Sequence, residues 1–261
     1  HRVFKRLIVI AVAAAAAVLA AVGTWKCNRW WRTWGIRPVD SVLPLPGDEL
    51  IETPAAADTR GITIAAPPEA VWPWLLQMGY GRAGWYSYDR LDMKGTSADR
   101  ILPEHQALAV GDIVPTDPAG GFEVKVLDPG RTLVLYVDTA LVTARATAMR
   151  DGTAEATPAG LAASGRFLET AVPPDFAVSW TFHLRPERDG GTRLIERMRL
   201  RAGPGTGATK ALAPVMGFGV FVMMQRQMVG VRERAERNPV PPVTAPADAA
   251  PDAFGEAPAP A

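Results

Sequence analysis

Glu196 is the carboxyl group with the clearest potential for acid–base chemistry. Residues 192–200 alternate as a strand, with Leu194, Met198 and Leu200 on the apolar face and arginines on the other. Glu196 shares the apolar face, and a carboxyl buried there must be paired or have a raised pKa. A salt bridge to a nearby arginine, or a break in register that exposes the side chain, would instead make Glu196 structural.

Asp89 is the second candidate acid or base, at the end of a glycine-hinged aromatic loop or short helix over residues 81–89. The loop carries Trp85, Tyr86 and Tyr88, which could form the mouth of a cavity with their rings inward and their hydroxyls outward. The alternative is that these rings cap a hydrophobic core and that Asp89 only caps or pairs with a neighbouring arginine.

Other chemistries find little support. One cysteine, Cys27, excludes a disulfide scaffold, and three histidines make a multi-histidine metal centre improbable, so we expect no metal and no cofactor. His183 falls on the polar face of its strand and should be solvated. The 28 basic and 27 acidic residues are nearly balanced, which gives no reason to expect nucleic-acid binding.

The first 37 residues predict a membrane anchor. Residues 7–25 contain no charge, and as a helix they would span about 28 Å, close to the hydrocarbon thickness of a bilayer. Tryptophans alternate with Lys26, Arg29 and Arg32 just beyond, as is typical of the headgroup region. A cleaved signal peptide is the alternative. Bases flank the run on both sides, so its orientation stays open, although we favour a single-pass protein with a cytoplasmic domain.

The rest of the chain divides into three parts. Residues 38–60 contain four prolines and predict an extended tether, residues 61–237 form the folded domain, and residues 238–261 form a Pro/Ala-rich acidic tail that we expect to be disordered.

Within the domain, strand and helix signals follow one another in a recognisable order. A short strand over residues 61–65 precedes a helix that begins at Pro67–Pro68 and should be kinked or broken by Pro73. Alternating strands joined by tight turns follow, and a long helix over about 208–237 ends the domain. This order predicts an α+β domain with an antiparallel sheet, whereas residues 139–175 give no clear signal.

Several motifs resemble the START-like SRPBCC superfamily, which includes polyketide cyclases/dehydrases and lipid-transfer proteins. The run from Ile62 to Trp72 is similar to its opening strand and helix, and residues 79–89 and 97–101 resemble an uncharacterised bacterial subgroup. The resemblance covers about residues 47–237. It implies a helix-grip fold, in which the antiparallel sheet wraps around the long C-terminal helix and leaves a hydrophobic cavity between them.

The last helix carries four methionines, whose soft and unbranched side chains adapt to varied apolar shapes. With the resemblance, this predicts a membrane-anchored protein that binds a hydrophobic small molecule or lipid. The alternatives are a cyclase, dehydratase or hydrolase that uses Glu196 or Asp89, and a partner-binding scaffold. The expected ligand-binding residues line the cavity and its mouth: Trp85, Tyr86, Tyr88, Trp180, Phe182, Met198, Met216, Phe221, Met223 and Met224. Plain packing of a buried core would use the same residues.

Overall fold

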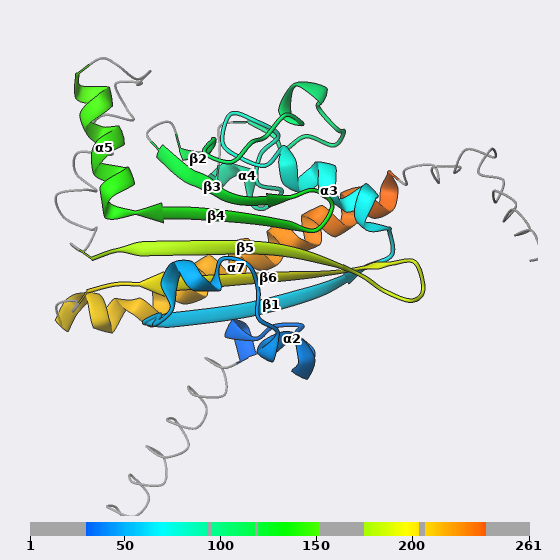
Figure 1. Cartoon of the computed structure of the whole chain (residues 1–261), viewed down its shortest axis with the longest axis horizontal. Helices are drawn as coiled ribbons and strands as arrows, with labels where there is room; N and C mark the ends of the chain where they lie inside the picture. The colour runs from blue at the N-terminus through cyan, green and yellow to red at the C-terminus, as the bar shows by residue number, and fades with distance from the viewer. Residues whose placement is uncertain (1–29, 93–94, 118–119, 152–174, 204–206, 239–261) are drawn as a thin grey trace, which may run out of the picture.

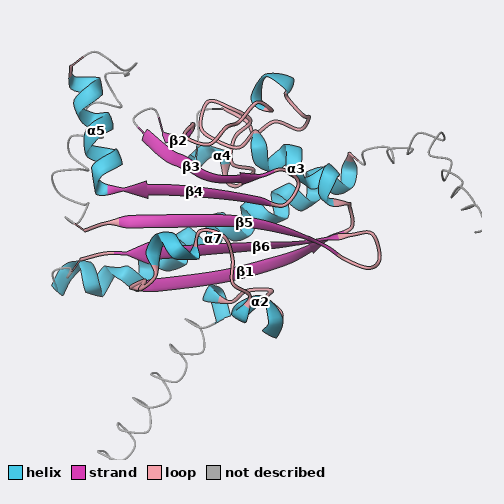
Figure 2. Ribbon diagram, in the orientation of Figure 1, coloured by secondary structure: helices cyan, strands magenta, loops and turns pink. Residues whose placement is uncertain are grey.

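The computed structural model describes residues 30–92, 95–117, 120–151, 175–203 and 207–238. It shows an α+β domain (Figures 1 and 2) with a six-stranded sheet and a long C-terminal helix. The strands are β1 (Ala56–Ile64), β2 (Ile113–Asp117), β3 (Gly120–Asp128), β4 (Thr132–Asp138), β5 (Ala177–Pro186) and β6 (Thr192–Arg201). The helical segments are α2 (Pro38–Val42), η1 (Asp48–Ile51), α3 (Pro68–Leu76), α4 (Asp89–Asp92), η2 (Pro103–His105), α5 (Thr139–Arg150) and α7 (Gly207–Arg237).

The sheet has the order β1-β6-β5-β4-β3-β2, and every neighbouring pair is antiparallel. The predicted antiparallel sheet and terminal helix are therefore confirmed. Register shifts interrupt the β2–β3 and β3–β4 pairings, where an extra residue bends the strand and increases its twist. Helix α7 runs along one face of the sheet, where it packs against β1 and α3 (Figure 1).

The face of the sheet toward α7 forms the hydrophobic core. Strand β5 directs Trp180, Phe182 and Leu184 to this side, and the paired positions on β4 are Leu135 and Leu133. On α7, residues three, four and seven apart close the core from the other side, as one face of a helix requires: Met224, Met228, Val231 and Ala235. The alternation predicted for β5 and β6 is thus correct, and it fixes which side chains face the helix.

The opposite face of the sheet is also covered, by the segment that carries α2 and η1. The expected extended tether over residues 38–60 is therefore wrong, because this segment folds onto the sheet and continues directly into β1. Gly47 lies so close to the sheet that a Cβ there would be 2.6 Å from Val134, and the Thr181 hydroxyl donates to the Pro46 carbonyl. His183 is likewise buried rather than solvated, with Nδ1 2.9 Å from the Thr132 hydroxyl.

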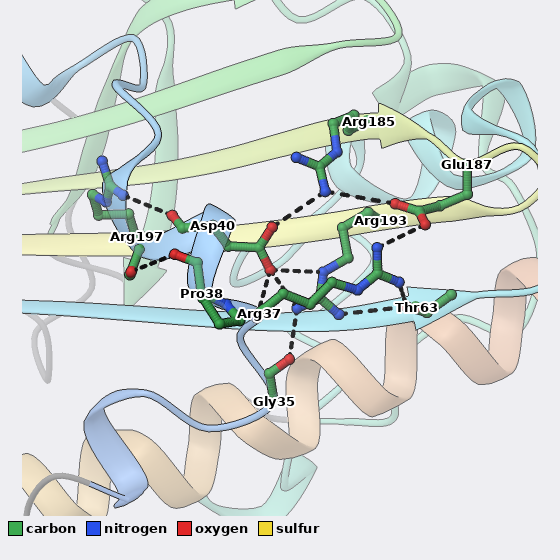
Figure 3. A network of polar contacts seen from close by, with 10 residues as sticks. Gly35, Arg37, Pro38, Asp40, Thr63, Arg185, Glu187, Arg193 and Arg197 are labelled. Atoms are coloured by element: carbon green, nitrogen blue, oxygen red, sulfur yellow. Dashed lines mark hydrogen bonds and ion pairs between the residues drawn. The ribbon is translucent and has the colours of Figure 1, made fainter.

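Asp40 fastens this segment to the sheet (Figure 3). Its fully buried carboxylate accepts hydrogen bonds from Arg193 at 2.7 and 3.1 Å, from Arg185 at 3.3 Å and from the Arg37 backbone N–H at 2.9 Å. Burial alone would raise the pKa of Asp40, but these donors and cations outweigh it and hold that pKa below its ordinary value. Gly61 on β1 makes room for the network, since a Cβ there would be 2.4 Å from the Arg193 guanidinium.

Three further expectations concern the helices and termini. Pro73 lies inside α3 without ending it. Helix α5, which no pattern predicted, begins the 139–175 region. The predicted membrane span over residues 7–25 and the tail over residues 239–261 lie outside the described residues; within those residues, none of the helices combines the length and apolarity that a bilayer crossing demands.

We expect Asp40→Asn to destabilise the protein by roughly 3 kcal/mol, because it leaves the Arg193 guanidinium buried without its counter-ion. Urea denaturation near neutral pH measures the change. Because folding lowers the pKa of Asp40, wild type should keep this contribution above about pH 4 and lose it as the pH falls further. The exposed Glu104→Gln variant is the control; equal stability of the two variants would contradict the assigned role of Asp40.

Candidate functional site

Glu196 lies in the middle of β6 and faces α7. In the register of the sheet it is opposite Arg60 on β1 and Phe182 on β5, with no break in pairing on either side. The side chain is fully buried, and its Oε1 accepts a hydrogen bond of 2.5 Å from Trp180 Nε1. Its other oxygen, Oε2, is buried without a hydrogen-bond partner among the residues described. Among the described residues no direct salt bridge reaches Glu196, and the register of β6 is unbroken around it, so neither structural alternative considered from the sequence is found there.

Arg60 is the cation opposite Glu196, but its N–H groups are directed elsewhere. Nε donates to the Trp31 carbonyl at 3.0 Å, Nη2 to Asp58 at 3.0 Å, and Nη1 lies 3.1 Å from the Met224 sulfur. The whole side chain is buried. Arg60 therefore acts on Glu196 through its charge, while its hydrogen bonds join β1 to the start of the domain and to α7.

Burial dominates the electrostatics of Glu196. It raises the pKa of this carboxyl to about 7, although the charge of Arg60 and the hydrogen bond from Trp180 pull in the opposite direction. Burial also raises the pKa of Asp58, against the charges of Arg60 and Arg32. A carboxyl with a pKa near 7 can give up or take up a proton near neutral pH, which is the property a general acid or base needs.

Aromatic rings surround Trp180, the residue that donates the hydrogen bond to Glu196. The Trp180 indole stacks on Trp85, with centroids 5.4 Å apart and planes inclined by 15°, and it also contacts Phe122 and Phe182 at 5.6 and 4.9 Å. From α7, Gln227 adds a second buried group with an incomplete set of partners. Its Nε2 lies 3.3 Å from the Met78 sulfur, while its Oε1 has no partner in the described part of the chain.

The structure brings many of the predicted binding residues to one side of the sheet. Trp180 and Phe182 face α7, Met198 belongs to the same row of β6, and Met224 joins the same core from the helix. Phe221 is buried apart from them, against Trp30, Trp31 and Arg60. Met223 is half-buried and accepts a hydrogen bond from Ser87 through its carbonyl. Met216 lies in α7, but its side chain is outside the described residues.

The aromatic loop differs from the expected cavity mouth. Tyr86 points inward, and its hydroxyl donates to the Trp74 carbonyl at 3.1 Å instead of reaching outward. Tyr86 adopts φ 58°, a conformation that L-residues rarely adopt, and Gly230 of α7 packs directly against its backbone. Tyr88 is the exposed ring of the group. The loop is therefore fastened to α7 through Tyr86 and Ser87.

Asp89 is occupied by the neighbouring loop. Its Oδ1 accepts from the Ser97 hydroxyl at 2.5 Å and its Oδ2 accepts from the Ser97 backbone N–H at 3.0 Å. The Ser97 hydroxyl also accepts from the Tyr86 backbone N–H. With both oxygens engaged, Asp89 holds two loops together, which leaves Glu196 as the stronger of the two candidate acids.

Two hollows, each of about 430 Å³, open on the side of the sheet opposite the expected cavity. One lies beside Arg197 and Arg199, whose guanidinium groups already bind Asp48 and backbone carbonyls. The other lies at the β5–β6 turn between Arg185 and Asp189. Within the described residues, the histidines and carboxylates form no group suited to a metal ion.

Sequence reasoning missed Arg60 because it placed the start of β1 at residue 61. The alternation of the strand extends backward, so Asp58, Arg60, Ile62 and Ile64 share the face toward α7. Extending the period-two alternation backward would have placed Arg60 on the same face as Ile62 and Ile64.

Comparison with known proteins adds no identity. No protein-family model and no curated protein matches the chain. Protein MLL2253 from Mesorhizobium loti is 15% identical and matches 71% of this chain and 100% of its own, with a TM-score of 0.34. Protein CV1439 from Chromobacterium violaceum is also 15% identical and matches 70% and 98%, with a TM-score of 0.35. Protein Ms6760 from Mycobacterium smegmatis is 14% identical and matches 69% and 88%, with a TM-score of 0.31. TM-scores this low say nothing about fold or activity.

We expect Glu196 to make the protein less stable as the pH rises. Its pKa of about 7 in the folded state exceeds the ordinary carboxyl value, so between about pH 4.5 and 7 the folded state holds a proton that the unfolded state has lost. The free energy of unfolding should fall by about 3 kcal/mol across this range.

Urea denaturation of wild type and Glu196→Gln at a series of pH values measures this effect. The difference between the two proteins isolates Glu196 from the histidines and from Asp58, which titrate in both. A difference that does not vary with pH would show that folding leaves the pKa of Glu196 unchanged.

Proposed function

We propose that this chain is a membrane-anchored, helix-grip protein that binds a hydrophobic small molecule or lipid between the sheet and α7. The observation that carries the proposal is Glu196 Oε2, a buried hydrogen-bond acceptor without a partner among the described residues, on the face that meets α7. An unpaired buried acceptor is costly, so a site that retains one is suited to a guest that supplies the donor.

The surroundings of Glu196 support an apolar guest with one polar group. Rings and thioethers from β5, β6 and α7 provide the apolar surface, and burying a ligand against them contributes about 25 cal/mol per Å². Glu196 Oε2 and Gln227 Oε1 can both accept a hydrogen bond, and neither has a partner among the described residues, so either one would orient a hydroxyl or amine N–H on the guest.

Trp85 is the group that must move to admit the guest. It stacks on Trp180 and comes from a loop, whereas Trp180 is fixed within the centre of the sheet. Displacement of Trp85 would open the apolar surface beside the Glu196–Trp180 hydrogen bond. The membrane anchor predicted from residues 7–25 would keep the domain close to a supply of apolar molecules.

An enzyme acting on a hydrophobic substrate is the second candidate, and the pKa of about 7 for Glu196 favours it. In this role Glu196 would transfer a proton through Oε2 while Trp180 holds Oε1 in place. Any small molecule recovered with the protein is then the first substrate to test. Turnover by wild type and not by Glu196→Gln would favour catalysis over binding.

Binding can be tested with N-phenylnaphthylamine, an apolar fluorophore with a single N–H donor. The full chain, in nanodiscs of defined synthetic lipid, should show saturable energy transfer from tryptophan to the probe beyond that of empty nanodiscs. We expect Glu196→Gln to weaken binding about tenfold. The amide oxygen should take the place of Oε1 and accept from Trp180, which puts the NH₂ group where Oε2 accepts in wild type.

The exposed Glu104→Gln variant, which makes the same chemical change away from the site, should bind the probe as wild type does. Solvent extraction of the same nanodiscs, followed by mass spectrometry, should recover an apolar molecule that is not the synthetic lipid. A lack of saturable transfer together with recovery of synthetic lipid alone would overturn the proposal.

A further inference from the structure

Two exposed aromatic side chains lie close together, one at the start of the described chain and one in the first half of α7. Trp30 is 56% exposed and Phe218 is 45% exposed. The buried ring of Phe221 contacts both, with ring-centroid distances of 5.4 Å to Trp30 and 5.8 Å to Phe218. We call Trp30 and Phe218 the apolar patch.

The apolar patch is held rigidly from beneath. Trp31 is buried against α7, so close to Gly217 that a Cβ there would be 2.8 Å from its ring. Arg60 lies 5.5 Å from the Phe221 centroid, and its Nε binds the Trp31 carbonyl. Trp30 and the first half of α7 are therefore parts of one packed unit.

The position of the patch along the chain indicates what covers it. The uncharged run over residues 7–25 ends five residues before Trp30, and five residues span at most about 18 Å. Lys26 and Arg29 lie in that short connection. Arg32 follows Trp30, is partly exposed and lies 5.0 Å from the Trp31 ring centroid. Tryptophan beside cations is the side-chain combination that favours the headgroup region of an anionic bilayer.

We propose that the apolar patch lies in the headgroup region of an anionic bilayer, with Arg32 beside it, so that the domain rests on the membrane and does not hang from a flexible connection. This inference rests on the anchoring part of the proposed function, and it is independent of ligand binding. It places the start of α7 at the membrane. Phe221 contacts Arg60, and Arg60 contacts the Met224 sulfur. These packed side chains connect the apolar patch to the side of the sheet that carries Glu196.

The test uses the full chain with Cys27→Ser, which removes the only cysteine, and a single new cysteine labelled with bimane. Trp30→Cys and Phe218→Cys place the label in the patch. Val110→Cys is the matched control, because Val110 is 62% exposed and belongs to the loop before β2. The labelled proteins are reconstituted with phosphatidylcholine and phosphatidylglycerol, some of which carries a doxyl quencher near the top of the acyl chain.

Both patch labels should be quenched several-fold more by the doxyl lipid than the Val110 label, and several-fold less by iodide in solution. Replacing phosphatidylglycerol with phosphatidylcholine should reduce the lipid quenching at both patch positions. These results would support the inference, and agreement between two patch positions guards against a local effect of one substitution.

Three outcomes would overturn it. If the chain floats with vesicles but all three labels are equally open to iodide, residues 7–25 anchor the protein while the patch faces water. If the patch labels are shielded from iodide without quenching by doxyl lipid, another protein surface or a second copy covers them. If the chain does not float with vesicles at all, the anchor and the docked patch both fail, and ligand binding remains to be judged by the fluorophore titration.

Discussion

The ion pair between Asp40 and Arg193 is the interaction on which burial of the sheet on both faces depends. Strand β6 directs Arg193, Arg197 and Arg199 away from α7, and a face with three arginines would normally meet water. The segment with α2 and η1 supplies Asp40 and Asp48, which pair with all three. Because charge is matched by charge, the polar residues of β5 can be buried beneath the same segment.

Glu196, on the other face of the sheet, is a buried carboxyl with few partners. Asp40 has several donors and a lowered pKa, whereas Glu196 has one donor, from Trp180, and a raised pKa. At Asp40 the hydrogen bonds and the charges of Arg193 and Arg185 outweigh burial, whereas at Glu196 burial outweighs the Trp180 hydrogen bond and the charge of Arg60. The fold supplies arginines to Asp40 but leaves Glu196 Oε2 without a hydrogen-bond partner among the described residues. This contrast is the main reason to propose a role for Glu196 in ligand binding or proton transfer.

The strand alternation and the long terminal helix could be predicted because each follows from a local periodicity. The same alternation placed Glu196 on the face toward the core. The role of residues 38–60 could not be predicted, since prolines indicate only an extended backbone, and the pairing of Asp40 with arginines about 150 positions away leaves no local signal. The inward hydroxyl of Tyr86 was missed for a similar reason, because its partner lies on α3 and its neighbour Gly230 on α7.

The course of the chain around β1 has a consequence for self-association. Strand β1 is an outer strand of the sheet, and outer strands invite pairing with another molecule. Here the Gly61 N–H donates to the Trp34 carbonyl, and beyond the end of the strand the Ala65 N–H donates to the Glu236 carboxylate. On the far side of the sheet, the Pro115 carbonyl of β2 accepts from Tyr80. Copies crowded together on a surface would thus find these three backbone groups already engaged, which disfavours edge-to-edge pairing at these positions.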